Sequence, residues 1–200
     1  MNVLVANYGN DSIALIQYAF EQGIPDVTVV SIDTDYAHPS WGERVKAGEI
    51  WAQSLGFTVV RLKSKLGFNA LVEAQREFPT PKFAWCAVYL KGDTLRTWLS
   101  AVDPLKETKL LLARRRDQSP LFSHLREHLE HTEEYEGRDV WHPLYLHSDL
   151  EMNILAKKAP LPVLSHRSLE CEPCIHEKLK NSGATFIYEM GCGTVYGCGL

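Results

Sequence analysis

Apolar runs rich in β-branched residues alternate with stretches whose apolar residues recur at helical spacing along the first 113 residues of this chain. A run of the first kind is typical of a buried strand, and a stretch of the second kind is typical of an amphipathic helix. The predicted strands and helices follow in chain order at 3–6, 11–22, 27–32, 40–55, 58–62, 68–77, 94–102 and 109–113. Such alternation predicts an α/β fold in which a single Rossmann-like parallel sheet is covered by helices on both faces.

The composition is that of one compact domain. The 200 residues are 45% hydrophobic, which is enough for an ordinary core. After about residue 158 the pattern breaks into Pro160, Pro162 and a cysteine-rich stretch. We therefore expect a domain at 1–158 and a cysteine-rich C-terminal segment at 159–200 that packs on it and is not an independent domain.

Charge and hydropathy limit the classes of partner. The net charge of −4 argues against a broad non-specific grip on nucleic acid. The apolar run at the N-terminus is too short for a signal peptide or a membrane span. We expect a cytoplasmic protein without membrane association, in which the five cysteines stay reduced and favour metal or catalytic roles over disulfides.

The first strand-to-helix turn is the expected ligand site, because ligands of such sheets bind beyond the carboxyl ends of the strands. Gly9 lets the backbone pass close to a ligand, and Asp11 or Ser12 can cap the following helix, whose N-terminus favours an anion. The alternative is a capped helix start without a ligand. The turn consists of Asn7, Tyr8, Gly9, Asn10, Asp11 and Ser12.

Polar residues at the end of the second predicted strand would lie beside this turn. Asp33, Thr34 and Asp35 could bind a ribose, an adenine amine or a magnesium ion. In the alternative interpretation, this segment binds no ligand and only leads into the next helix, which Ser40 caps.

Three consecutive arginines follow the fourth predicted strand. Arg114, Arg115 and Arg116 would present forked donors that match phosphate or sulfate oxygens. A solvated charge run is the alternative, but the position directly after a buried strand favours an anion site.

The cysteines are concentrated near the end of the chain, at Cys171, Cys174, Cys192 and Cys198, while Cys86 stands alone upstream. A Cys-x-x-Cys pair places two thiolates within reach of one metal centre. A distant cysteine completes such a site when the fold brings it back. The alternative is a set of buried free thiols, since cysteine packs as a small hydrophobe.

The order and spacing of these motifs resemble one family along nearly the whole chain. The segments that carry the resemblance are 7–12, 32–35, 82–91, 115–120, 141–144, 148–149 and 166–174. They are similar to the sulfonucleotide reductases, which reduce adenylyl sulfate or phosphoadenylyl sulfate (PAPS). These enzymes belong to the pyrophosphate-loop adenine nucleotide alpha hydrolase superfamily, so the resemblance implies an adenine-nucleotide-binding domain at 1–158.

The resemblance also implies a [4Fe–4S] cluster and a catalytic thiol. Cys86, Cys171 and Cys174 correspond to cluster ligands, and Cys192 is the candidate for the fourth. Cys198, in a Gly-Cys-Gly-Leu sequence, corresponds to the nucleophile that attacks the sulfonate sulfur. The family's reaction would then need a thioredoxin- or glutaredoxin-type reductant to release sulfite.

Three departures from the family pattern keep a second function class open. Trp85 stands where the family has a second cysteine, and three cysteines would leave one iron open, which resembles cluster-dependent thiolases of the superfamily. The loop at 7–12 lacks the lysine of ATP pyrophosphatases, and Asp35 replaces a glycine. The alternative is an adenylating enzyme of the ATP pyrophosphatase type that inserts sulfur or nitrogen into a nucleobase or another carbonyl substrate.

A third interpretation is a nucleotide-binding protein with a structural zinc at Cys171, Cys174, Cys192 and either Cys86 or His176. A nucleic-acid partner is expected only for the adenylating enzyme, and a homodimer is compatible with every interpretation. His124, His128 and His131 recur at helical spacing among glutamates, which predicts a solvated helix face rather than a metal site.

Overall fold

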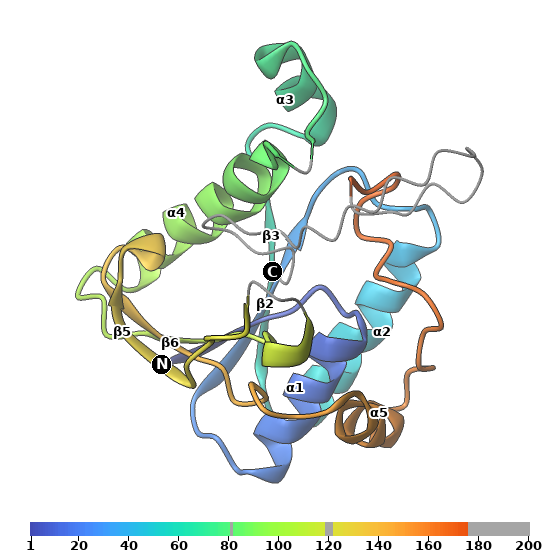
Figure 1. The fold of residues 1–200 in the computed structure, drawn as a ribbon, viewed down its shortest axis with the longest axis vertical. Coiled ribbons are helices and arrows are strands. Elements are labelled where there is room, and N and C mark those ends of the chain that lie inside the picture. Colours follow the sequence, from blue (N-terminus) through green and yellow to red (C-terminus); the bar gives the residue numbers. More distant parts are fainter. Residues whose placement is uncertain (81, 119–121, 176–200) are drawn as a thin grey trace.

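The computed structural model describes residues 1–80, 82–118 and 122–175. Their strands form a six-stranded sheet in the order β3-β2-β1-β4-β6-β5 (Figure 1). All neighbouring pairs are parallel except β5 and β6, which are antiparallel. The predicted α/β class is therefore confirmed, with an antiparallel strand added at one edge. The strands are β1 Asn2–Val5, β2 Val27–Asp33, β3 Thr58–Lys63, β4 Lys109–Leu111, β5 His128–Thr132 and β6 Arg138–Trp141.

Five α-helices connect or follow these strands within the described residues. Their starts and ends agree with the sequence prediction to within about two residues where a helix was predicted. A π-helical turn, η1, precedes α4 and carries Cys86. The helices are α1 Asn10–Glu21, α2 Trp41–Ser54, α3 Phe68–Gln75, η1 Cys86–Gly92, α4 Asp93–Val102 and α5 Asp149–Lys158, with short 3₁₀ turns η2 at Arg116–Gln118 and η4 at Glu133–Tyr135.

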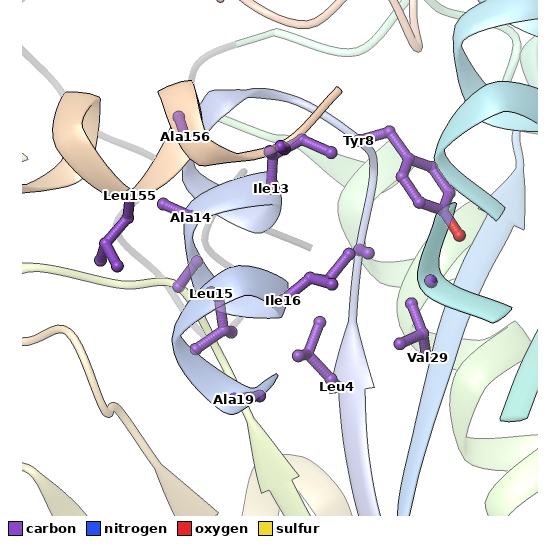
Figure 2. Packing of buried hydrophobic residues seen from close by; sticks show 14 of the residues in the cluster. Leu4, Tyr8, Ile13, Ala14, Leu15, Ile16, Ala19, Val29, Leu155 and Ala156 are labelled. Atoms are coloured by element: carbon purple, nitrogen blue, oxygen red, sulfur yellow. The ribbon is translucent and has the colours of Figure 1, made fainter. Parts of the chain in front are cut away.

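Helices cover both faces of the sheet, which explains why β1 is a continuous apolar run rather than an alternating one. Leu4 of β1 packs with Ile13 and Ile16 of α1 in a core shared with α2 and α5 (Figure 2). Val3 and Val5 point to the opposite face, where they share a second core with α4. Successive side chains of a strand alternate between faces, so one short run serves two cores.

A third, smaller core joins α3 to the π-helical turn. Phe68 stacks on Tyr36 with ring centroids 3.8 Å apart and on Trp85 at 5.6 Å. Trp85 is fully buried in this core together with Leu90. Because Trp85 directly precedes the turn, its burial fixes the position from which Cys86 projects.

After α5 the chain turns back and runs beside α2 towards the carboxyl ends of the strands (orange in Figure 1). The Arg44 guanidinium of α2 donates to the carbonyl of Pro162 at 2.9 Å. The side chain of Asn10, at the start of α1, pairs with both backbone groups of Leu164. These contacts tie residues 159–175 to the rest of the described domain, and residues 176–200 lie outside the described residues.

The predicted helix that would carry His124, His128 and His131 is wrong for residues 128–132. Residues 128–132 form β5, and Leu129 packs against the second core while His128 and Glu130 are exposed. The spacing of the histidines matches the helical period by coincidence. In the structure Leu129 pairs with β6 and packs against the second core, as a strand residue does. A second correction concerns the start of α1, where Gly9 is the N-cap and neither Asp11 nor Ser12 caps the helix.

Candidate functional site

The loop after β1 is organised around one amide side chain. Asn7 Oδ1 accepts hydrogen bonds from the Gly9 backbone N–H at 2.9 Å and from the Ser12 hydroxyl at 3.1 Å. A Cβ atom at Gly9 would lie 3.0 Å from Asn7 Oδ1 and 3.4 Å from the Cβ of Ser168, so glycine is favoured here by close packing. The loop is thus closed on itself and faces the C-terminal segment.

Tyr8 contributes to this loop through its backbone only. Its φ angle of 59° lies in the left-handed region, and the ring is turned away from the loop into the first core (Figure 2). The ring lies against the backbone of Gly48 in α2, where an added Cβ would be 2.2 Å from Tyr8 Cδ1. Burial holds the pKa of the Tyr8 phenol above its usual range. Of the predicted ligand-binding groups of Tyr8, only the backbone therefore lies in the loop.

The segment after β2 lies beside the loop, as the parallel topology requires. Asp33 accepts a hydrogen bond from the Asp35 backbone at 2.9 Å, and Asp35 faces Lys63 at 3.5 Å. The Thr34 hydroxyl donates to the carbonyl of Glu170 in the C-terminal segment. Of the three predicted nucleotide-binding residues, Thr34 is buried, whereas the carboxylates of Asp33 and Asp35 are more accessible to solvent.

Glu170 joins the loop after β1 to the π-helical turn. Its Oε1 atom accepts from Asn7 Nδ2 at 2.9 Å and lies 2.8 Å from the ammonium of Lys91. Lys91 is almost completely buried. Burial alone lowers the pKa of Lys91, but the Glu170 carboxylate more than offsets this effect, and the pKa lies above its usual range. The lysine is therefore a charged group inside the protein.

Three cysteines line one pocket with this ion pair. Cys86 comes from the π-helical turn, and Cys171 and Cys174 come from the C-terminal segment; all three are free thiols. Burial raises the pKa of the Cys171 thiol to about 11, although the Lys91 ammonium acts in the opposite direction. Burial also raises the pKa of Cys86. The structure thus places the upstream cysteine and the Cys-x-x-Cys pair around one pocket.

The spacing of these thiols differs from that of a single-metal site. Among the described residues, no three histidine, cysteine or acidic side chains are grouped closely enough to hold one metal ion. Thiolates on one tetrahedral zinc are only about 4 Å apart, since each Zn–S bond is about 2.3 Å. In the described part of the chain the three thiols of the pocket therefore do not form a single-metal site, and Cys192 and Cys198 lie outside the described residues.

The three arginines do not converge on one position. Arg114 is buried and pairs with Glu134 at 3.1 Å, whereas Arg115 is buried and pairs with Asp149 at 2.6 Å. Arg116 donates to the carbonyl of Leu125 and lies over the ring of Tyr145. Each guanidinium thus has a protein partner of its own.

Asp11 and Gln118 connect the arginine segment to α1. The Gln118 amide donates to Asp11 Oδ2 at 2.9 Å. Burial raises the pKa of the Asp11 carboxyl, and the nearby Arg115 partly opposes this rise. The pairing places the start of α1 against the segment that follows β4.

Sequence reasoning missed two residues of this site. Lys91 and Glu170 lie within the segments 82–91 and 166–174 that carry the family resemblance, but neither is predicted as a site residue. The available signal was a charged residue within an apolar or cysteine-bearing segment, since buried charges in proteins are paired. The ion pair joins residues from distant parts of the chain, so no local sequence pattern predicts it.

Comparisons with known proteins agree with this geometry at the level of the fold. No protein-family model and no curated protein matches the sequence. A PAPS reductase from Candida auris matches with a TM-score of 0.55 and 14% identity, covering 81% of this chain and 74% of its own. The U34-tRNA thiolase NcsA from Methanococcus maripaludis, with its [4Fe–4S] cluster, matches with a TM-score of 0.57 and 14% identity, covering 89% and 61%.

A third solved structure, NMN synthetase from Francisella tularensis, matches with a TM-score of 0.54 and 13% identity, covering 80% of this chain and 62% of its own. The chain thus shares the Rossmann-like α/β fold of these solved structures. It spans less than two thirds of the thiolase and of the NMN synthetase. None of the helices within the described residues has the length and apolar character that a membrane span requires.

Proposed function

We propose that this protein reduces an adenylated sulfate, adenylyl sulfate or PAPS, to sulfite, with an iron–sulfur cluster bound near the nucleotide. One observation carries the proposal: three free thiols and a buried ammonium line a single pocket next to the loop after the first strand. Neither thiols nor a lysine are needed to bind adenine. Their position at the nucleotide edge of this fold therefore points to sulfur chemistry.

The residues of the pocket match the ligand chemistry of an iron–sulfur cluster. Thiolates are the standard ligands of such clusters, and Cys86, Cys171 and Cys174 are free and line one pocket. These three residues would hold the cluster, with Cys192 proposed as a fourth ligand. When bound, the cluster would supply iron charge beside the anionic group of the nucleotide.

The nucleotide would lie along the loops after β1 and β2. Residues 7–12 carry no basic side chain, and the buried ammonium of Lys91 contacts the same Glu170 oxygen as Asn7 of this loop. This ammonium would face the anionic group of the adenylated sulfate. Asp33 and Asp35 would then accept from ribose hydroxyls or the adenine amine, since carboxylates are strong acceptors.

The chemical step would use Cys198 as the nucleophile. Its thiolate forms a bond to the sulfonate sulfur while the bond from that sulfur to the phosphate oxygen breaks and takes its electron pair to the leaving AMP or its 3′-phosphorylated form. An external dithiol of the thioredoxin or glutaredoxin type then reduces the enzyme thiosulfonate. Sulfite leaves, the Cys198 thiol is restored, and the dithiol is oxidised to a disulfide.

A second candidate is an ATP-using enzyme that adenylates a carbonyl substrate and inserts sulfur or nitrogen. Two observations favour it. Trp85, which stands where the resembling family has a second cysteine, is buried in a core, and Arg114 and Arg115 are engaged in ion pairs rather than free for sulfate. A nucleobase in RNA is a candidate substrate for this function only.

The test is an anaerobic assay with the purified protein, a thioredoxin-type reductant and either adenylyl sulfate or PAPS, with sulfite as the product measured. Sulfite formation supports the reductase. Release of pyrophosphate from ATP without sulfite from either nucleotide would replace it with the adenylating enzyme. Replacing Cys198 by serine should remove sulfite formation and leave the iron content unchanged, whereas Cys171→Ser should lower the iron content as well.

A further inference from the structure

Glu170 lies where the loop after β1 and the buried ammonium of Lys91 meet. Asn7 Nδ2 and Lys91 Nζ both contact the same carboxylate oxygen, at 2.9 Å and 2.8 Å. Ser168 adds a weaker contact to this oxygen at 3.5 Å. An amide and an ammonium directed at one oxygen are the donors that also bind a phosphate or sulfate group.

The position of Glu170 is fixed from several sides. Its backbone carbonyl accepts the Thr34 hydroxyl, and the backbone of the neighbouring Leu169 accepts from the His38 N–H at 3.0 Å. Its carboxylate is largely buried, with 13% of the side chain exposed. The carboxylate therefore belongs to the folded interior and is not a freely moving surface group.

The ammonium of Lys91 needs an anion, because a buried charge without a partner is strongly destabilising. Glu170 is the acidic side chain in contact with it. An incoming phosphate or sulfate that contacts Asn7 and Lys91 would provide the same compensation from outside the chain. Two anions cannot share this position, since like charges at hydrogen-bond distance repel.

We propose that the Glu170 carboxylate is an intramolecular competitor of the nucleotide's anionic group, which must displace it from Lys91 and Asn7 in order to bind. This inference rests on the nucleotide-binding part of the proposed function. Because Glu170 directly precedes Cys171, its displacement moves the chain next to the cysteine pocket. Nucleotide binding is thereby coupled to the position of a thiol that lines that pocket.

The test compares AMP, which carries one phosphate, with adenosine, which carries none, using calorimetric titration of the cluster-loaded protein. Glu170→Gln keeps the shape of the side chain and removes its charge. The variant should bind AMP about tenfold more tightly or better than the wild type, since the phosphate now faces an uncompensated ammonium. The affinity for adenosine should stay unchanged.

Glu172→Gln is the matched control. Glu172 flanks Cys171 on its other side, is more exposed, and contacts His38 rather than Lys91. Its AMP affinity should remain within about twofold of the wild type. An unchanged or weaker AMP affinity in Glu170→Gln would overturn the inference, as would an equal gain for adenosine, which indicates general loosening.

A measurement on the wild type covers the case in which Glu170→Gln does not fold. AMP should accelerate amide hydrogen exchange at Leu164 and Glu172, whose N–H groups bond to Asn10 and Tyr36, and adenosine should not. Slower or unchanged exchange with AMP would contradict the displacement. If the wild type binds neither AMP nor adenosine, the nucleotide function itself is refuted together with the inference, and this result is distinct from the others.

Discussion

Replacing Gly48 by alanine tests how the nucleotide loop is anchored to the core. Gly48 lies within α2, where alanine normally stabilises a helix by about 1 kcal/mol relative to glycine. Here the added Cβ would lie 2.2 Å from Cδ1, 2.6 Å from Cε1 and 2.9 Å from Cγ of Tyr8. The fully buried ring must therefore move, and overpacking of this kind costs about 1–3 kcal/mol.

Gly42→Ala in the same helix is the matched control, because its added Cβ has no heavy atom within 4 Å. We expect Gly42→Ala to raise the free energy of unfolding by up to about 1 kcal/mol and Gly48→Ala to lower it by about 2 kcal/mol. Urea unfolding followed by circular dichroism measures both values. The reasoning is refuted if the two variants are equally stable.

A double-mutant cycle attributes the cost to the ring. In a Tyr8→Leu background, Gly48→Ala should cost less than in the wild type, because the smaller side chain leaves room for the added methyl group. Since Tyr8 lies between Asn7 and Gly9, displacement of its ring should also weaken AMP binding in Gly48→Ala. Retention of full affinity would show that the loop is not held by this contact.

Three further predictions concern the ion pairs and the loop. Burial raises the pKa of the Asp103 carboxyl, but hydrogen bonds from Arg138, Glu107 and Thr108 together outweigh this and lower the pKa to about 2. The resulting stability of about 2 kcal/mol should be present above pH 4 and lost as the pH falls towards 2, and acid titration of Arg138→Met, which should show a weaker dependence, checks it. Burial lowers the pKa of His142 to about 4, so the ring is neutral in the folded protein above this pH. About 3 kcal/mol of the free energy of unfolding should be lost as the pH falls from 6.5 to 4, because the unfolded chain takes up a proton in this range. The free energy of unfolding of His142→Asn should depend less on pH in this range, and a pH dependence identical to that of the wild type would contradict the assignment. Asn7→Ala removes the acceptor of Gly9 and Ser12, and we expect a loss of about 1–3 kcal/mol in urea unfolding together with weaker AMP binding; unaltered binding would exclude Asn7 from the nucleotide site.

Strands β1 to β4 and most of the helices could be predicted from the sequence because their periodicity reflects burial on two faces, whereas β5 and β6 were not predicted. The run at 3–6 is apolar at every position since both sides of β1 are covered. Strand β5 is not predicted because it is a short edge strand with mostly exposed side chains. Leu129 is its apolar residue that packs against the second core. Such a pattern contains too few apolar residues to distinguish a strand from a helix.

The candidate site was predictable where short spacing carries the chemistry. The pair Cys171 and Cys174 could be recognised from its spacing, and the resemblance to a known family added Cys86. The link between Asn7 and Glu170 joins residues 163 positions apart, and no local pattern indicates it. The three arginines illustrate the opposite case, because a strong local pattern suggested one anion site and the fold gives each guanidinium a separate partner.

The central claim is that Cys86, Cys171 and Cys174 hold one iron–sulfur cluster at the nucleotide edge of the sheet. The most direct test is the metal content of the anaerobically purified protein, measured by mass spectrometry of the elements. The account predicts about four irons per chain and little zinc. One zinc per chain without iron, or no bound metal, would contradict it.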